Sequence, residues 1–161
     1  MNSTQMIDVG GKAITPREAV ASGEIWLLAS TARLVREAAV PKGNVLEVAR
    51  VAAIMAAKRT PDLIPLCHPL LISHAGCEFE FAPDLDALQA AASTCIRATT
   101  RVRCAGQTGV EMEALAAVSA ALLTIYDMTK GIDDTLRITD IVLLEKTGGK
   151  SGDWKRQGSS A

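Results

Sequence analysis

The chain has 161 residues and a formal net charge of −1 at pH 7, so it is long enough for one domain with a real core and has no overall field that would attract nucleic acid. Aromatic residues make up only 3% of the chain, and the core must therefore be built from Ala, Val, Leu and Ile. No stretch reaches the roughly 18 uninterrupted apolar residues of a membrane span, and the N-terminus has no apolar signal region.

The N-terminal third is predicted to contain an arm, an ambiguous segment and two helices. Residues 1–14 have the character of an arm with some extended structure. Residues 15–18, Thr-Pro-Arg-Glu, match a helix start with a Thr cap, Pro at the first position and Glu three residues after the cap. The run over 18–27, however, fits either a short helix or a strand. Residues 29–38 and 44–58 favour helices. The second of these is capped by Asn44, and its predicted apolar face consists of Val45, Val48, Val51, Ala52 and Met55.

The segment from Lys58 to Pro69 (KRTPDLIPLCHP) combines cations, a carboxylate, a thiol and an imidazole with three prolines. The prolines argue against a helix or a central strand, and they stiffen the segment so that its polar groups are held ready at little further entropic cost. Because loops carried by a scaffold often hold function, we interpret this segment as part of a site. The alternative is a proline-rich connection whose histidine is satisfied locally.

Alternating side chains predict two strands after this loop. The first begins at Leu71 and has an acidic outer face, and the second covers about 94–103 and has a basic outer face. These faces favour an antiparallel pair held in register by opposite charges. The outward residues are Glu78 and Glu80 in the first strand, and Arg97, Arg101 and Arg103 in the second.

A long helix is predicted over about 110–130, where the sequence is apolar almost all round. Such a helix must be buried on most sides, between a sheet and either a partner helix or a second subunit. Gly131 ends it, and a last strand follows over about 136–144. Residues 155–161 are predicted to be a disordered tail, which leaves 1–154 as a single domain.

Asp127 and Lys130 lie three residues apart and so share a face of this helix. A surface ion pair of little energetic value is the simple interpretation. A carboxylate at a helix C-terminus is poorly placed for the helix dipole, however, and beside a lysine it suits proton transfer. Glu113 lies 14 residues earlier, roughly 21 Å along the axis. Either the substrate is long or a second subunit completes the site.

Glu111 and Glu113 lie in the first turn of the helix, where carboxylates suit the helix dipole. The dipole is a sufficient explanation for Glu111, but Glu113 also borders the buried surface. Cys67 and His68 raise the possibility of nucleophilic catalysis. Neighbours in sequence rarely form a working pair, so we favour His68 as a hydrogen-bonding or substrate-orienting group.

The four cysteines form no C-x-x-C pair. This spacing argues against structural zinc and against a disulfide framework, and it predicts reduced thiols and a cytoplasmic protein.

The glycine-rich run Gly148–Gly152 resembles a phosphate-binding loop but does not match the P-loop pattern, because Leu144 stands where that pattern requires glycine. Backbone N–H groups of glycine-rich turns still form anion nests. With Lys146 and Lys150 nearby, phosphate contact is one interpretation, and a flexible solvated loop is the other.

Several long motifs occur together and in a fixed order. They are Lys42-Gly43 and residues 56–70, 108–115, 123–130 and 146–152. Through these motifs the chain resembles, over about residues 7–154, the cyclic pyranopterin monophosphate synthase family of molybdenum-cofactor biosynthesis.

The resemblance implies a phosphorus–oxygen lyase that converts 3′,8-cyclo-7,8-dihydro-GTP to cyclic pyranopterin monophosphate and releases pyrophosphate. It implies an α+β fold with a ferredoxin-like antiparallel sheet packed with helices. It also implies a homohexamer, a trimer of dimers, with active sites at subunit interfaces. Whether Lys42 and Asp127 meet across such an interface is an open question. No residue requires a metal or an organic cofactor.

The residues that the resemblance assigns to catalysis are Asp127, Lys130 and Lys42. The candidate substrate-binding residues are Leu66, Cys67, His68, Met112, Glu113, Glu111, Arg17, Lys58, Lys146 and Lys150. The basic residues among them suit the triphosphate, and Glu113 and His68 suit the guanine-derived edge.

One departure from the family is the segment 82–93, which is longer than usual and falls at a hairpin turn, where insertions are tolerated. Two other functions are weighed against the lyase. One is a different nucleotide or pterin lyase on the same scaffold. The other is a non-catalytic oligomeric adaptor, which would have little use for the Asp127–Lys130 pair.

Overall fold

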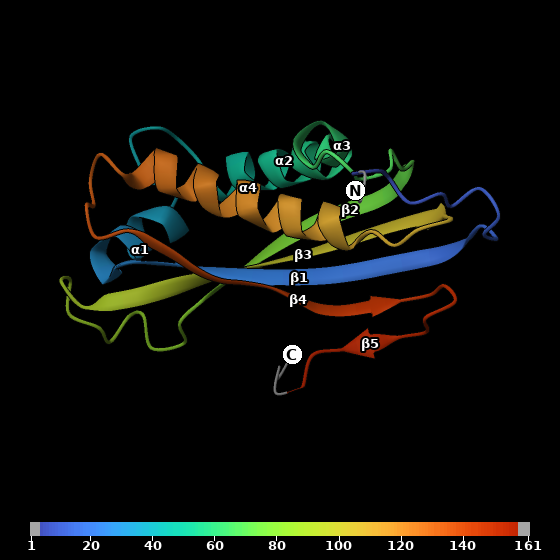
Figure 1. The fold of residues 1–161 in the computed structure, drawn as a ribbon. Helices are drawn as coiled ribbons and strands as arrows, with labels where there is room; N and C mark the ends of the chain where they lie inside the picture. The colour runs from blue at the N-terminus through green and yellow to red at the C-terminus, as the bar shows by residue number, and fades with distance from the viewer. Residues whose placement is uncertain (1–3, 158–161) are drawn as a thin grey trace.

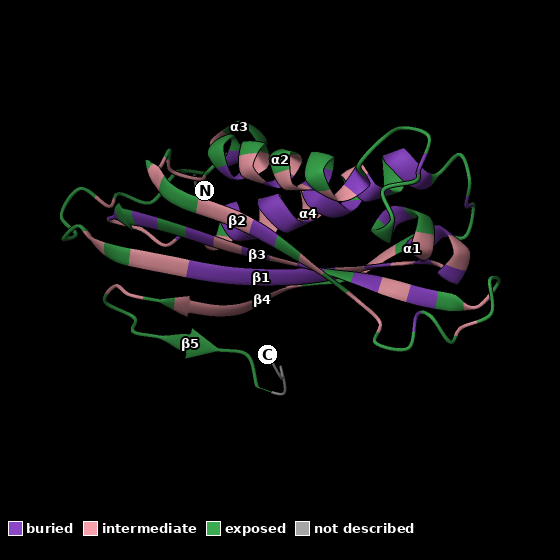
Figure 2. Ribbon diagram, turned by 180° about the vertical axis from the view of Figure 1, so that it is seen from behind, coloured by how far each residue is buried: buried purple, intermediate pink, exposed green. Residues whose placement is uncertain are grey.

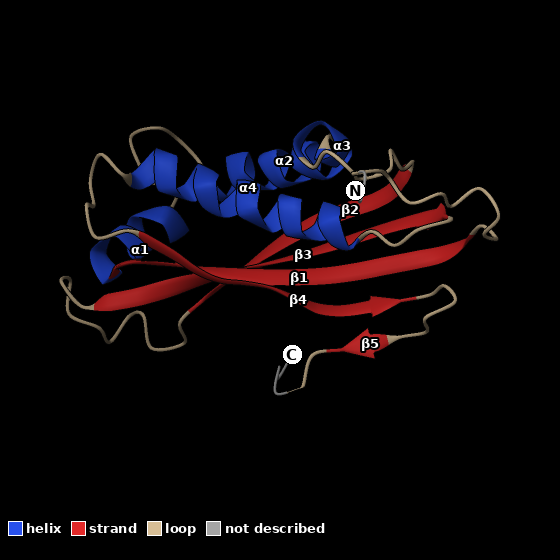
Figure 3. Cartoon of the chain, viewed as in Figure 1, coloured by secondary structure: helices blue, strands red, loops and turns tan. Residues whose placement is uncertain are grey.

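The computed structural model describes residues 4–157 and shows an antiparallel sheet with helices on one face (Figures 1 and 3). The strand order is β2-β3-β1-β4-β5, so the predicted ferredoxin-like α+β fold is confirmed, with β5 added at one edge. The elements are β1 Thr15–Leu28, α1 Ala29–Arg36, α2 Val45–Lys58, α3 Thr60–Leu63, β2 Ile72–Phe81, β3 Ser93–Gly106, α4 Glu111–Thr129, β4 Arg137–Thr147 and β5 Trp154–Lys155.

Strand β1 forms the middle of the sheet and pairs with β3 on one side and β4 on the other. The predicted helix start at 15–18 is therefore wrong, and the strand alternative for 18–27 is right. Pairing with two long neighbours outweighs a local capping pattern. Figure 2 shows how thoroughly the middle of β1 is buried. Gly23 lies there because a Cβ would stand 2.7 Å from Leu122 Cδ1 of α4, so the glycine lets helix and sheet approach closely.

The predicted β2–β3 hairpin is confirmed, but the predicted ion pairs between the glutamates of β2 and the arginines of β3 are not what the structure shows. The arginines of β3 form their ion pairs with glutamates of β1. Arg97 pairs with Glu24 at 2.8 Å, and Arg101 and Arg103 both pair with Glu18. Glu24 and Glu18 lie directly opposite Arg97 and Arg103 in the β1–β3 ladder, and cross-strand neighbours of opposite charge pair readily.

Helix α2 begins and ends where the sequence predicts. The Asn44 side chain accepts a hydrogen bond from the backbone N–H of Glu47 at 3.2 Å, which is the expected N-cap. The predicted apolar face is right at Val45 and partly right at Ala52, which is half-buried, but wrong at Val48, Val51 and Met55, which are exposed. The buried residues recur every four positions and are Val45, Ala49, Ala53 and Ala57. Small side chains at this spacing allow the helix to approach its neighbours closely.

Helix α4 packs on the sheet beside α2, which packs on β2 of the same sheet face, so α2 is the partner helix that the apolar sequence of α4 required (Figure 1). The face toward the core is fully buried at Val118, Leu122 and Ile125. The opposite side is open, since Leu123 is 61% exposed, and the expected burial on almost all sides is only partly met. By length and composition α4 would suit a membrane span, but half of it is buried inside the fold, as in the core helix of a globular protein.

Two connections carry structure that the sequence did not predict. A single helical turn, α3, lies inside the proline-rich segment, so the expectation that its prolines exclude a helix is wrong at Thr60–Leu63. Pro61 is in the first turn, where the missing N–H does no harm. In the long 82–92 connection Leu85 is buried, and Arg33 of α1 donates to its carbonyl at 2.8 Å. Of the predicted disordered tail, Lys155 belongs to β5, and residues 158–161 lie outside the described residues.

The cap of α2 generates a first prediction. Replacing Asn44 by Ala leaves the Glu47 N–H without its side-chain acceptor and should lower the free energy of unfolding by about 1 kcal/mol. Asn44→Ser keeps an oxygen acceptor and should retain most of the stability. Urea denaturation of the two variants beside the wild type measures the difference, and equal loss in both would show that the cap contributes nothing.

Candidate active site

The predicted site residues gather at the two ends of α4. Asp127 and Lys130 lie at its C-terminal end, where Lys42 approaches from the turn before α2. Glu111 and Glu113 lie at its N-terminal end. Fourteen residues of helix, roughly 21 Å, separate Glu113 from Asp127. One chain therefore presents two separate groups of predicted site residues, and each group is built from segments that are distant in sequence.

At the C-terminal end, two ammonium groups bracket the Asp127 carboxylate. Lys42 Nζ lies 3.0 Å from Oδ2, and Lys130 Nζ lies 2.7 Å from Oδ1. Lys42 Nζ also donates to the Asp127 backbone carbonyl at 2.7 Å, so it offsets the exposed end of the helix dipole as well. These contacts explain how a carboxylate is tolerated at this position. They also show that Lys42 and Asp127 meet within one chain.

This Lys42–Asp127–Lys130 cluster favours its charged forms. The hydrogen bonds and charges of Lys130 and then Lys42 hold the pKa of Asp127 below its usual range, and Asp127 in turn raises the pKa of Lys130. All three side chains are at least half exposed. The cluster therefore presents a carboxylate and two ammonium groups to anything that binds over it.

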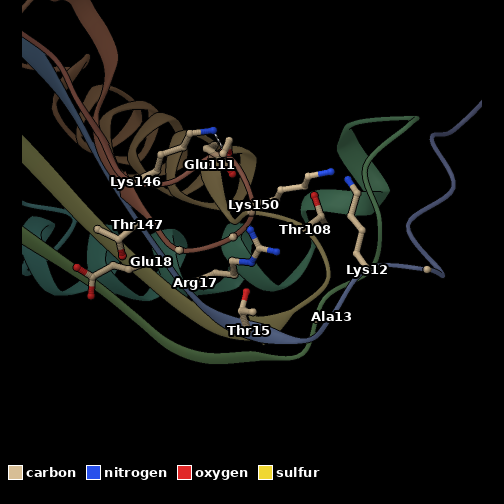
Figure 4. Close-up of a pocket in the computed structure, with 15 residues that line it drawn as sticks. Lys12, Ala13, Thr15, Arg17, Glu18, Thr108, Glu111, Lys146, Thr147 and Lys150 are labelled. Carbon is tan, nitrogen blue, oxygen red and sulfur yellow. Dashed lines mark hydrogen bonds and ion pairs between the residues drawn. The ribbon is translucent and has the colours of Figure 1, made fainter.

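At the N-terminal end of α4 lies a cavity of about 830 Å³, lined mainly by cations, threonines and glycines (Figure 4). Arg17 at its centre donates from Nε to the Gly106 carbonyl and from Nη2 to the Gln107 carbonyl, both at 3.3 Å. Its charge is not neutralised by these carbonyls. The polar lining residues are Lys12, Thr15, Arg17, Glu18, Thr108, Glu111, Lys146, Thr147, Lys150 and Ser151.

The glycine-rich loop after β4 forms one wall of this cavity. Gly148 and Gly149 have φ values of 88° and 83°, a conformation that other residues adopt at a cost. A Cβ on Gly149 would overlap the Arg17 guanidinium, and one on Gly148 would overlap the Pro16 carbonyl. The two glycines therefore let the loop close on Arg17. Lys146, at the end of β4, forms an ion pair with Glu111 at 2.9 Å.

Glu113, in the first turn of α4, is buried and forms a pair with the half-buried Cys67. Glu113 is only 1% exposed, its Oε1 accepts from Cys67 Sγ at 3.6 Å, and its Oε2 has no hydrogen-bond partner among the described residues. Burial raises the pKa of Glu113, and burial together with the Glu113 charge raises the pKa of Cys67 to about 11. A nucleophilic cysteine requires a lowered pKa, so Cys67 is unsuited to hydrolase chemistry.

The other predicted binding residues occupy more open positions. His68 Nε2 is 2.8 Å from the Ile7 carbonyl, so the imidazole contacts the N-terminal arm. Leu66 and Met112 are exposed apolar side chains, and Lys58 is exposed at the last residue of α2, outside the lining of the cavity. Within residues 4–157, no group of three or more His, Cys, Asp or Glu side chains is arranged to hold a metal ion.

Residues 6–149 match the MoaC family. The chain is also similar to three curated proteins that each bear the name cyclic pyranopterin monophosphate synthase. It is 57% identical to that of Chloroflexus aurantiacus over 94% of this chain and 88% of the relative. It is 55% identical to that of Chloroflexus aggregans (97% and 90%) and 50% identical to that of Pelotomaculum thermopropionicum (98% and 88%).

The chain belongs to the MoaC family. The match covers the Lys42–Asp127–Lys130 cluster and all of the cavity lining except Lys150 and Ser151. The family resemblance was evident from the motifs, but some residues of the cavity were not singled out from sequence. Thr15 and Thr147 line it, and the Gln107 carbonyl accepts a hydrogen bond from Arg17, but none of the three was proposed as a site residue. The one useful indication was the flanking glycines, which mark turns where a ligand approaches the backbone closely.

The contact between Gly149 and Arg17 gives a second prediction. Gly149→Ala should displace the guanidinium and raise the Kd for inorganic pyrophosphate about tenfold, the value of one lost charged hydrogen bond. Gly152→Ala is the matched control, because Gly152 also has positive φ but a Cβ there would meet no described atom within 4 Å. Calorimetric titration of both variants measures the effect. An equal loss in the control would attribute it to backbone strain alone.

Proposed function

We propose that this member of the MoaC family converts 3′,8-cyclo-7,8-dihydro-GTP to cyclic pyranopterin monophosphate with release of pyrophosphate, an early step of molybdenum-cofactor biosynthesis. The observation that carries the proposal is the pairing of a cation-lined cavity at one end of α4 with a Lys-Asp-Lys cluster at the other. The first suits a triphosphate, and the second suits proton transfer. The shared name of the close relatives supports the same activity.

The cavity would bind the triphosphate. Arg17, Lys146 and Lys150 place positive charge around a space of about 830 Å³, and the glycine-rich loop adds backbone N–H groups. Charge that develops when pyrophosphate leaves is stabilised by cations that are already in place. Lys146 is held by Glu111, so its ammonium is oriented before the substrate arrives. Lys58 would extend the cationic surface from the end of α2.

The Lys42–Asp127–Lys130 cluster would move protons as the purine-derived ring opens and recloses. In the unliganded protein Asp127 is held as a carboxylate and Lys130 as an ammonium, so neither is poised to exchange a proton at neutral pH. Substrate that separates a lysine from Asp127 brings both pKa values back toward neutrality. Catalysis by this cluster thus depends on substrate binding between its members.

Glu113 and its neighbours would recognise the guanine-derived edge. Its free Oε2 is buried and needs a partner, and burial favours the neutral acid, which can both donate and accept a hydrogen bond. Cys67 contacts Glu113 from the proline-rich segment, and His68 is the next residue of that segment. Leu66 and Met112 offer apolar contact to the planar ring.

We further propose that the active protein is a cytoplasmic homohexamer, a trimer of dimers, whose sites lie at subunit interfaces. The two groups of candidate site residues in one chain are too far apart to act on one small substrate, so the end of α4 with Asp127 would face the cavity of a neighbour. An exposed apolar row on α2, formed by Val48, Val51 and Met55, provides surface that an assembly could cover. Nucleic acid and membrane are not expected partners.

The proposed role of Asp127 gives a third prediction. With enzymatically made 3′,8-cyclo-7,8-dihydro-GTP, the wild type should release pyrophosphate and form a pterin that fluoresces after oxidation. Asp127→Asn should lower the turnover at least about a hundredfold, as expected for loss of a proton-transfer group, while substrate binding persists. Asp134→Asn, at a nearby exposed aspartate, is the control. Binding without turnover in the wild type would favour the adaptor instead.

A fourth prediction tests the shared site. Mixed hexamers of Arg17→Ala and Asp127→Asn subunits should recover activity up to about a quarter of the wild type, because random pairing leaves that share of interfaces intact. Mixing Lys42→Ala with Asp127→Asn should give no recovery, since both residues belong to one cluster of one chain. Native mass spectrometry verifies the mixing. No recovery in the first mixture would place the whole site within single subunits.

A further inference from the structure

The N-terminal arm passes the mouth of the cavity without forming a helix or strand, and side chains from two other segments hold it. Gln107 Nε2 donates to the backbone carbonyls of Gly10 at 3.2 Å and of Lys12 at 2.9 Å. His68 Nε2 contacts the Ile7 carbonyl at 2.8 Å. Backbone carbonyls of an exposed arm have no need of such partners, because water can satisfy them. The contacts therefore indicate that the position of the arm at the cavity serves a function.

Gln107 also contributes to the position of Arg17. Its backbone carbonyl accepts from Arg17 Nη2 at 3.3 Å, while its side chain holds the carbonyl of Lys12. One residue thus connects the arm to the central cation of the cavity. Figure 4 shows the Lys12 side chain extending toward Lys150 across the cavity, and both residues belong to its lining.

We propose that Gln107 is a positioning residue that holds Lys12 over the cavity, where Lys12 acts as a further cation for the phosphate chain of the ligand. The identity of that ligand rests on the function proposed above, but the anion class does not. The arm contains Gly10 and Gly11 directly before Lys12, and glycine loses more conformational freedom on ordering than other residues. Without the contacts of Gln107, the segment around Lys12 would be ordered only when the ligand binds, and the entropy lost in that ordering would weaken the affinity.

The carboxamide suits this task better than a charged group would. Its NH₂ supplies two donors on one atom, and both are used by neighbouring carbonyls of the arm. Because the carboxamide is neutral, it neither repels an anion, as a carboxylate would, nor forms an ion pair with Lys12 or Arg17 that would weaken their attraction for the anion. Inside the arm, the Lys12 N–H donates to the Val9 carbonyl at 2.9 Å, and the Asp8 carboxylate accepts from the Gly10 N–H at 2.8 Å, so the held segment is a compact turn.

The test is a double-mutant cycle on the full-length protein with inorganic triphosphate as the probe. Gln107→Met removes the donors with little change of size, and Lys12→Met removes the charge. Each should raise the Kd about three- to tenfold, the range for a charged hydrogen bond near solvent. The double variant should bind no more weakly than Lys12→Met alone, because Gln107 acts through Lys12. Gln89→Met, on the remote 82–92 connection, is the control and should bind like the wild type.

Turnover gives a second readout that a purely structural role would not produce. Gln107→Met should raise the KM for the nucleotide and leave kcat nearly unchanged, and its thermal unfolding should match that of the control. Additive effects in the cycle, an unchanged Kd in Gln107→Met, or no triphosphate binding by the wild type would each overturn the proposal. Failure of the proposed function is distinguishable, because it would abolish turnover in the wild type while the binding cycle kept its coupling.

Discussion

The close packing of α4 on the central strand β1 determines where the chemistry lies. The contact depends on small residues, with Gly23 beneath Leu122 and alanines along the buried face of the helix. Thr100 of β3 adds a hydrogen bond from its buried hydroxyl to the Ala114 carbonyl at 2.8 Å. A core almost without aromatic residues compensates for its small side chains by this close approach. The helix thereby holds one group of candidate site residues at each end, in fixed positions relative to each other.

Electrostatics differ between the two ends, and the difference matches the proposed tasks. The N-terminal end gathers cations around a cavity and leaves them only partly neutralised, as anion binding requires. The C-terminal end holds one carboxylate between two ammonium groups. In the proposed function, these three groups stay charged and paired until the substrate binds between them. The arginine–glutamate pairs of the sheet link neighbouring strands, and one of their glutamates, Glu18, also lines the cavity.

Errors in the sequence analysis had a common cause. The helix start at 15–18 was inferred from local capping, the face of α2 from the largest apolar residues, and the partners of the β3 arginines from the nearest acidic strand. In each case a neighbour distant in sequence decided the outcome. β3 and β4 made residues 15–28 a strand, α4 and the sheet selected the alanine face of α2, and β1 lay closer to the arginines than expected.

The sequence by itself determined the family, the order of the main helices and strands after residue 29 apart from α3 and β5, and the charged residues of the candidate site, because motifs and hydrophobic period are local properties. Only the tertiary structure decided that Lys42 joins Asp127, that Gly149 makes room for Arg17, and that Gln107 holds the arm beside the cavity. These contacts join segments between 85 and 132 residues apart. Such separations are closed by the pairing of strands and the packing of helices, which no local pattern specifies.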